Sequence, residues 1–124
     1  MNEIDQLFAD FTDALHRGDC DGLAELVTED AEFWTHGVAA MKGREHVRAA
    51  MRQACEQYVV ERSWEEVERM CGDDFMVSVG VERTRATPRA GGDAVEVVQR
   101  GWTMARRGAD GRWRFARGIT NRDA

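Results

Sequence analysis

The sequence predicts an α+β domain in which three helices cover one face of a curved antiparallel β-sheet. Two observations support this fold. Apolar residues recur at helical spacing through the first half of the 124-residue chain, and long alternating stretches separated by turn residues begin at Tyr58. Helices segregated to one face of a sheet are typical of α+β folds. The length fits one domain over residues 1–124.

Three helices are predicted from apolar spacing and end signals. The first has Asn2 as its N-cap and ends at Gly18, and the third begins after Gly43. A short second helix follows the acidic segment 19–21. The three apolar stripes are Ile4, Leu7, Phe8, Phe11 and Leu15; Leu23, Leu26 and Val27; and Val47, Ala50, Met51, Ala54 and Cys55.

Five strands complete the predicted fold. A short one covers 31–36, and four long ones form an antiparallel meander. The long strands span 58–71, 74–87, 94–107 and 112–121, with turns or loops at 72–73, 88–93 and 108–111.

Closing the last two loops predicts a strand register. A four-residue loop at 108–111 places Trp102 opposite Arg117, so that an arginine interrupts an otherwise apolar face. The same closure pairs Met104 with Phe115, Arg100 with Ile119, and Val98 with Asn121. Closing the loop at 88–93 in the same way pairs Val79 with Trp102, Val77 with Met104, Val81 with Arg100, and Arg83 with Val98. These residues are interpreted as the inner face. The first hairpin is open between two registers, with either Trp64 and Glu66 or Glu65 and Val67 inward.

Charge and composition exclude several classes of protein. A net charge of −6 argues against non-specific nucleic-acid binding, and no apolar run is long enough to span a membrane. The N-terminus lacks the pattern of a secretory signal. Three cysteines, at 20, 55 and 71, indicate reduced thiols and a cytoplasmic protein more than a disulfide framework.

The order of several short motifs resembles the nuclear-transport-factor-2-like superfamily, and within it the SnoaL-like, or DUF4440-type, bacterial proteins. The motifs are "RGD" after the first helix, "EDAEF" entering a strand, "KGRE" opening the third helix and "DGRWRF" entering the last strand. The resemblance covers nearly the whole chain. It implies a cone-shaped sheet wrapped around a long N-terminal helix, a pocket at the open end and frequent homodimers.

The resemblance leaves the chemistry open, because the superfamily contains several kinds of enzyme and many members without known chemistry. Steroid isomerases of this type use a carboxylate base with a tyrosine, whereas the single tyrosine here, Tyr58, lies at the start of a strand. Epoxide hydrolases use an Asp–Arg–Asp set, but the position two residues after Arg100 is Trp102. The histidine pairs of the dehydratases are also missing at the inner positions. No known catalytic set carries over intact.

Arg117 needs an anion if it lies on the inner face, because burying an unpaired charge is costly. One alternative is an internal carboxylate from Glu66, Glu68 or Glu32. Another is the carboxylate, phosphate or polarised carbonyl of a ligand held by Arg100 and Arg117. A third is a wrong register, with Arg117 reaching the rim of the sheet.

The remaining candidate residues follow from the predicted pocket. His36 ends the first strand at the pocket mouth and could act as a base, so the candidate catalytic residues are His36, Arg100 and Arg117. The candidate ligand-binding residues are Trp34, His36, Met41, Trp64, Val81, Arg100, Trp102, Arg117 and Asn121. No metal site and no organic cofactor are expected, since the histidines and cysteines lack ligand spacing.

Two functions remain open at the level of sequence. One is a binding domain for a small organic molecule, without catalysis; the other is an acid–base lyase or isomerase acting on a carbonyl or carboxylate. A homodimer is expected through the outer sheet face. The residues assigned to that face are Val95, Val97, Thr103, Ala105 and Ala116.

Overall fold

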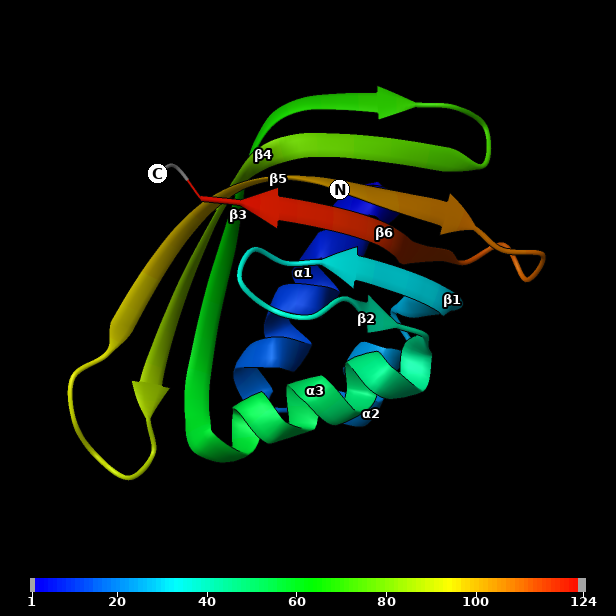
Figure 1. Ribbon diagram of the computed structural model, residues 1–124. Coiled ribbons are helices and arrows are strands. Elements are labelled where there is room, and N and C mark those ends of the chain that lie inside the picture. Colours follow the sequence, from blue (N-terminus) through cyan, green and yellow to red (C-terminus); the bar gives the residue numbers. More distant parts are fainter. Residues whose placement is uncertain (1, 123–124) are drawn as a thin grey trace.

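A curved six-stranded sheet wraps around the first helix in the computed structural model, which describes residues 2–122 (Figure 1). The chain runs through α1 (Glu3–Arg17), α2 (Cys20–Ala24), β1 (Val27–Trp34), β2 (Met41–Lys42), α3 (Arg44–Gln57), β3 (Tyr58–Cys71), β4 (Phe75–Pro88), β5 (Val95–Arg107) and β6 (Trp113–Asn121). The predicted α+β class, the curved sheet around the long N-terminal helix and the four long strands are therefore confirmed.

The helix ends follow their capping residues. The Asn2 side chain accepts a hydrogen bond from the Asp5 backbone, and Gly18 ends α1 with φ 71°, a left-handed conformation that favours glycine. Helix α2 is shorter than its apolar stripe suggests, because Val27 already begins β1. Helix α3 begins after Gly43 as predicted.

The strand order is β2-β1-β6-β5-β4-β3. Strand β1 pairs in parallel with β6 and antiparallel with the short β2, which the sequence did not predict. The sheet is therefore mixed rather than purely antiparallel. β6, the last strand along the chain, occupies an interior place in the sheet (Figure 1).

The predicted register is confirmed between β4 and β5 and wrong between β5 and β6. Val79 lies opposite Trp102 as predicted, but Trp102 lies opposite Ile119 and Arg117 lies opposite Met104. The loop is one residue longer than assumed, because Arg107 pairs with Trp113. A bulge then leaves Ala116 without a partner in β5, between the pairs Ala105–Phe115 and Met104–Arg117.

The longer loop and the bulge explain why Arg117 interrupts the apolar series of Trp113, Phe115 and Ile119. Phe115 points inward and is 4% exposed, whereas Ile119 is 47% exposed on the other side of the sheet. The bulge at Ala116 reverses the alternation between these residues, so Arg117 leaves the face that Phe115 occupies. Trp102 and Arg117 do share one face, but it is the convex one, facing away from the helices.

The predicted inner and outer faces are therefore exchanged on β4 and β5. Met76, Ser78 and Ala105 are fully buried on the concave face, while Trp102 is 55% exposed on the convex face. Thr103 and Ala105, expected on the outer face, point inward with the cross-strand partners Ser78 and Met76. The reason is that both faces are apolar, so periodicity cannot tell them apart. The concave face carries small residues because α1 and Trp64 fill the space above it.

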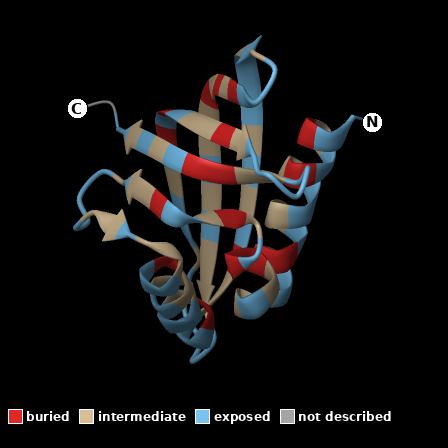
Figure 2. Ribbon diagram, turned by 90° about the vertical axis from the view of Figure 1, so that its right-hand side faces the viewer, coloured by how far each residue is buried: buried red, intermediate tan, exposed pale blue. Residues whose placement is uncertain are grey.

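The core lies where α1, α2 and α3 meet the concave face, and buried positions appear on both layers (Figure 2). Aromatic rings join the layers: Phe8 and Phe11 of α1 both contact the Phe115 ring edge-on, at centroid distances of 5.1 and 5.4 Å. Cys55 is part of this core. Within residues 2–122, each helix is too short or too polar to cross a bilayer.

Candidate functional site

A cavity of about 340 Å³ opens between the helices and the concave face of the sheet. Its wall is predominantly apolar, with residues from both long helices and from all six strands. The apolar members include Phe11, Leu15, Phe33, Met41, Val47, Met51, Ala54, Val60 and Phe115. A volume of this size and lining is typical of sites for small organic molecules.

Strand alternation brings the polar members of the wall together. Tyr58, Val60, Arg62 and Trp64 occupy alternate positions of β3 and all line the cavity. Across the ladder Arg62 faces Thr84, and Trp64 faces Glu82. This resolves the open hairpin register in favour of Trp64 and Glu66 on the inner face.

An ion pair between Arg62 and Glu82 is the main charged feature of the cavity. Nε and Nη2 of Arg62 each lie 2.9 Å from Oε2 of Glu82, and the side chains are 14% and 19% exposed. Thr84 donates its hydroxyl to Oε1 of Glu82 at 3.3 Å. The guanidinium carbon lies 5.2 Å from the Phe11 ring centroid and 5.8 Å from that of Trp64. Pairing and aromatic contact together offset the cost of burying these charges.

Two facing glycines accommodate the Trp64 indole on the concave face. Gly80 and Gly101 are cross-strand partners, and a Cβ on them would lie 3.0 and 3.5 Å from the indole. A Cβ on Gly80 would also come within 2.4 Å of the Glu65 carbonyl oxygen, so no larger residue fits without a shift. The indole Nε1 donates to the Ser78 hydroxyl at 2.9 Å. These contacts fix the ring plane at the inner end of the cavity.

Hydrogen bonds continue from Ser78 to the start of α1. Ser78 Oγ donates to Glu66 at 2.6 Å, Arg69 Nε donates to the same Glu66 oxygen at 2.9 Å, and Arg69 Nη2 donates to Asp5 at 2.8 Å. The hydrogen bond from Arg69 lowers the pKa of Asp5. Burial opposes the charge on Arg69, but hydrogen bonds to Glu66 and Asp5 outweigh it and raise the pKa of this arginine. These groups border a second, more open groove of about 670 Å³.

The predicted ligand-binding residues divide between the cavity and other surfaces. Trp34, Met41, Trp64 and Trp102 belong to the lining of the cavity, although the Trp102 side chain lies mostly on the convex face. The other five predicted residues, His36, Val81, Arg100, Arg117 and Asn121, are not part of this lining. His36 lies in the exposed loop after β1, where its backbone N–H donates to Thr120.

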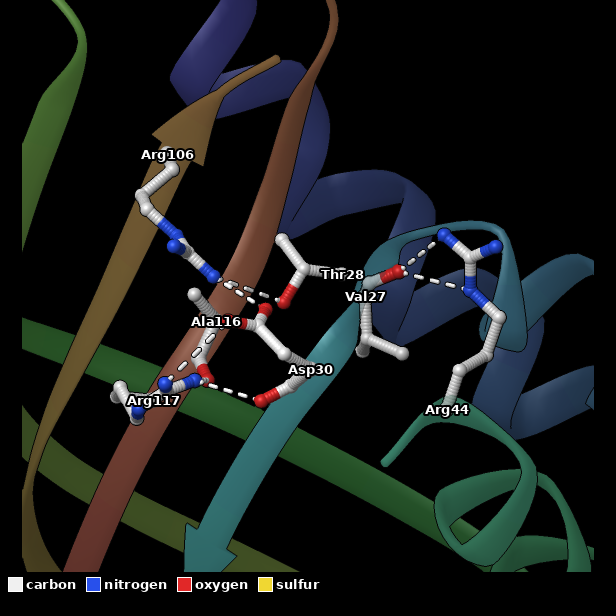
Figure 3. Close-up of polar contacts among 7 residues, drawn as sticks. All are labelled: Val27, Thr28, Asp30, Arg44, Arg106, Ala116 and Arg117. Atoms are coloured by element: carbon white, nitrogen blue, oxygen red, sulfur yellow. Dashed lines mark hydrogen bonds and ion pairs between the residues drawn. The ribbon is translucent and has the colours of Figure 1, made fainter. Parts of the chain in front are cut away.

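The anion that pairs with Arg117 is Asp30, which differs from the three predicted glutamates. Nη1 of Arg117 donates to the Asp30 and Ala116 carbonyls at 2.8 and 2.7 Å, and Nη2 lies 3.5 Å from Asp30 Oδ2. Arg106 donates to the other Asp30 oxygen, so one carboxylate lies between two guanidiniums (Figure 3). Hydrogen bonding from Thr28 and the charges of Arg106 and Arg117 lower the pKa of Asp30 despite partial desolvation. Arg117 thus has an internal partner on the exposed side of the sheet.

The charged residues of the cavity wall that the sequence did not predict are Arg62 and Glu82. Arg62 is two residues before Trp64, a predicted pocket residue, so strand alternation alone would have placed both on one face. Glu82 alternates with Gly80 and Thr84, on the face of β4 opposite to the one that carries Val77, Val79 and Val81, and apolar spacing therefore does not point to it. No group of three histidine, cysteine or acidic side chains within residues 2–122 could hold a metal ion.

Residues 8–116 match the family described as the SnoaL-like domain. No curated protein matches the chain. A conserved protein from Planctomyces limnophilus is similar in structure, with a TM-score of 0.86, 24% identity, and coverage of 96% of this chain and 94% of that one. A ketosteroid isomerase-like protein from Erwinia carotovora atroseptica has a TM-score of 0.80 and 19% identity, covering 95% and 92%.

An NTF2-like protein with a cystatin-like fold, from Novosphingobium aromaticivorans, is also similar. Its TM-score is 0.77 at 22% identity, covering 95% of this chain and 78% of that one. These identities establish the fold and leave the chemistry to the residues of this chain.

Proposed function

Because the chain belongs to the SnoaL-like domain family, whose members share a fold and not a reaction, we propose from its own cavity that it binds a small organic molecule. The ligand is largely apolar and carries one polar group, such as a hydroxyl or carbonyl. The observation that supports this function is the apolar cavity of about 340 Å³ with the Arg62–Glu82 pair in its wall.

The ion pair favours binding over catalysis. Arg62 engages one carboxylate oxygen of Glu82 and Thr84 engages the other. Both carboxylate oxygens therefore already have a donor within the protein, which is the arrangement of a structural ion pair. The oxygen of a ligand hydroxyl or carbonyl can still accept a hydrogen bond from Arg62, because this side chain has five N–H donors and Glu82 engages only some of them.

The proposed function is tested by ligand binding to the wild type and to a variant whose cavity is filled by a larger side chain. We expect 1-octanol, an apolar chain with one hydroxyl, to bind saturably in isothermal titration calorimetry and to raise the unfolding temperature by mass action. Ala54 lines the cavity from α3, and Ala54→Phe is expected to weaken this binding by at least about tenfold, as loss of pocket volume does.

The same substitution elsewhere on α3 is the control. Ala49 is exposed, so Ala49→Phe is expected to leave octanol binding unchanged. Absence of saturable binding to the wild type, or equal binding by the Ala54→Phe variant, contradicts the proposal.

The second candidate function is acid–base isomerisation, favoured by one observation: a carboxylate stands in an otherwise apolar cavity. Glu82 would take the proton between the carbonyl and the double bond of a β,γ-unsaturated ketone and return it to the far alkene carbon. Arg62 would donate to the enolate oxygen. Conversion of cyclohex-3-enone to its conjugated isomer, followed by absorbance and lost in Glu82→Gln, would support this function over binding alone.

We further propose that two copies pair through the convex face of the sheet. Three strands contribute a row in which Val79 faces Trp102 and Trp102 faces Ile119. Trp102 and Ile119 are 55% and 47% exposed. Neighbouring large apolar side chains with this much exposure are unusual on a monomer surface and are typical of an interface. Glu65 and Glu68 lie on β3, to one side of Val79, and Arg100 lies on β5, to its other side. A two-fold axis that passes near Val79 would therefore place the glutamates of one copy close to Arg100 of the other.

A cytoplasmic location is likewise our inference, supported by the cysteines. Cys20, Cys55 and Cys71 are all free thiols. Burial and the neighbouring Cys20 raise the pKa of the Cys55 thiol, which makes it a packing group rather than a reactive one.

A further inference from the structure

Trp64 borders both hollows of the molecule, the cavity and the open groove beside α1. We propose that the Trp64 indole is a partition that sets how long a molecule the cavity accepts. The inference rests on the proposed binding function and adds a length limit to it.

The order of residues along β3 places Trp64 between the two spaces. On the inner face of β3, Arg62 borders the cavity, Trp64 borders both spaces, and Glu66 borders the groove. On α1, Phe11 and Leu15 line the cavity, whereas the groove follows other positions of the same helix, from Asp5 and Phe8 to His16. The boundary between the two spaces therefore crosses β3 at Trp64 and follows α1 along its length.

The partition is held from several sides. The Phe8 ring stacks on the indole with centroids 6.4 Å apart and an interplanar angle of 12°, and the Arg62 guanidinium lies 5.8 Å from its centroid. The indole packs directly against the backbone at Gly80 and Gly101, and its Nε1 donates a hydrogen bond to the Ser78 hydroxyl. A side chain confined in this way does not swing aside for a longer ligand at low cost.

The space beyond the partition differs from the cavity in chemistry. Asp5, Glu66 and Arg69 form its polar side, and their hydrogen bonds do not depend on the indole. Ser78 keeps its bond to Glu66 when Trp64 is shortened. Removing the indole therefore extends the cavity toward the groove and leaves the remaining polar contacts in place.

A series of 1-alkanols tests the partition by calorimetry. Affinity in the wild type is expected to rise about fourfold for each methylene that the cavity buries. It levels off at the chain length that fills the space. In Trp64→Ala the rise is expected to continue to longer chains, with each further buried methylene again worth about fourfold.

Trp113→Ala is the matched control. It removes the same side chain from the start of β6, where Trp113 packs against the core outside both hollows, and the levelling-off is expected at the wild-type length. Trp64→Leu, which keeps apolar contact with Phe8, is the second variant and is expected to shift the limit by a smaller amount. Circular dichroism establishes that each variant is folded.

The outcomes separate the two proposals. If no alkanol binds the wild type, the binding function fails, and the length limit fails with it. If the affinity of the wild type rises with alkanol length and levels off at the same length in a folded Trp64→Ala or Trp64→Leu variant, the role of Trp64 as a partition is refuted and the binding function is not.

Discussion

Asp30 holds two arginines that come from different strands, Arg106 of β5 and Arg117 of β6. Because β1 and β6 are parallel neighbours, the carboxylate joins the helical half of the chain to its last strand. Arg117 also donates to the Ala116 carbonyl at the bulge, so its guanidinium supports an irregular part of the backbone. Its role in the structure is to stabilise the site where the strand changes register.

The lowered pKa of Asp30 predicts a pH-dependent contribution to stability. A carboxyl whose pKa is lower in the folded than in the unfolded chain stabilises the fold above its unfolded value, about 3.9. That contribution is lost as the pH falls through the folded value. Asp30→Asn is expected to cost about 1 kcal/mol in urea unfolding at pH 7, a value typical of partly exposed pairs, and nothing once the pH lies below the folded pKa.

Asp93→Asn, in the exposed loop between β4 and β5, provides the comparison. It is expected to change the free energy of unfolding by less than about 0.5 kcal/mol at either pH. An Asp30→Asn effect of equal size at pH 7 and in strong acid would contradict the ion-pair explanation.

At the scale of the element, β6 shows what the sequence could and could not reveal. Its bounds are predicted to within a residue, because Gly111 and the alternation of Trp113 with Phe115 mark its beginning. The register of β6 could not be predicted, because no residue type marks the one-residue bulge at Ala116. Small residues such as alanine fit a bulge and a regular strand equally well.

A pair of engineered cysteines tests the register directly. In a chain whose three native cysteines are replaced by serine or alanine, Trp102→Cys with Ile119→Cys is expected to form a disulfide under mild oxidation. Directly opposed residues have Cβ atoms about 4.5–5.5 Å apart, whereas diagonal ones are about 7–8 Å apart. Trp102→Cys with Arg117→Cys is therefore expected to remain reduced, as measured by thiol labelling and mass spectrometry. Preferential cross-linking of the second pair would support the register predicted from the sequence, which has a four-residue loop and no bulge.

On the scale of the whole molecule, the fold was predictable and the inside of the sheet was not. Helix caps at Asn2 and Gly18 and the turns between the strands are local signals, and they define the elements. The choice of face depends instead on what covers it. Gly80 and Gly101 look like poor core residues until the Trp64 indole is placed on them, whereas Trp102 looks like a core residue and lies on the convex face.

The proposed pairing of two copies is tested by placing a charge at the centre of the convex face. Trp102→Asp is expected to convert a dimer into a monomer in sedimentation velocity, because an unpaired carboxylate would be buried in the interface. Val38→Asp, an equally polar change at an exposed site in the loop after β1, is the control and is expected to preserve the dimer. A monomeric wild type at micromolar concentration, or a dimeric Trp102→Asp variant, would argue against this interface.

The interior place of β6 has a consequence for the order of folding during synthesis. Residues 113–121 must lie between β1, made early, and β5, made just before them. Until the ribosome has released this segment, both neighbours present open hydrogen-bonding edges, which are prone to pair with other chains. The nascent protein therefore closes its sheet in one late step, and a message truncated a few codons before Trp113 would leave the sheet divided into β2-β1 and β5-β4-β3, with an open edge on each part.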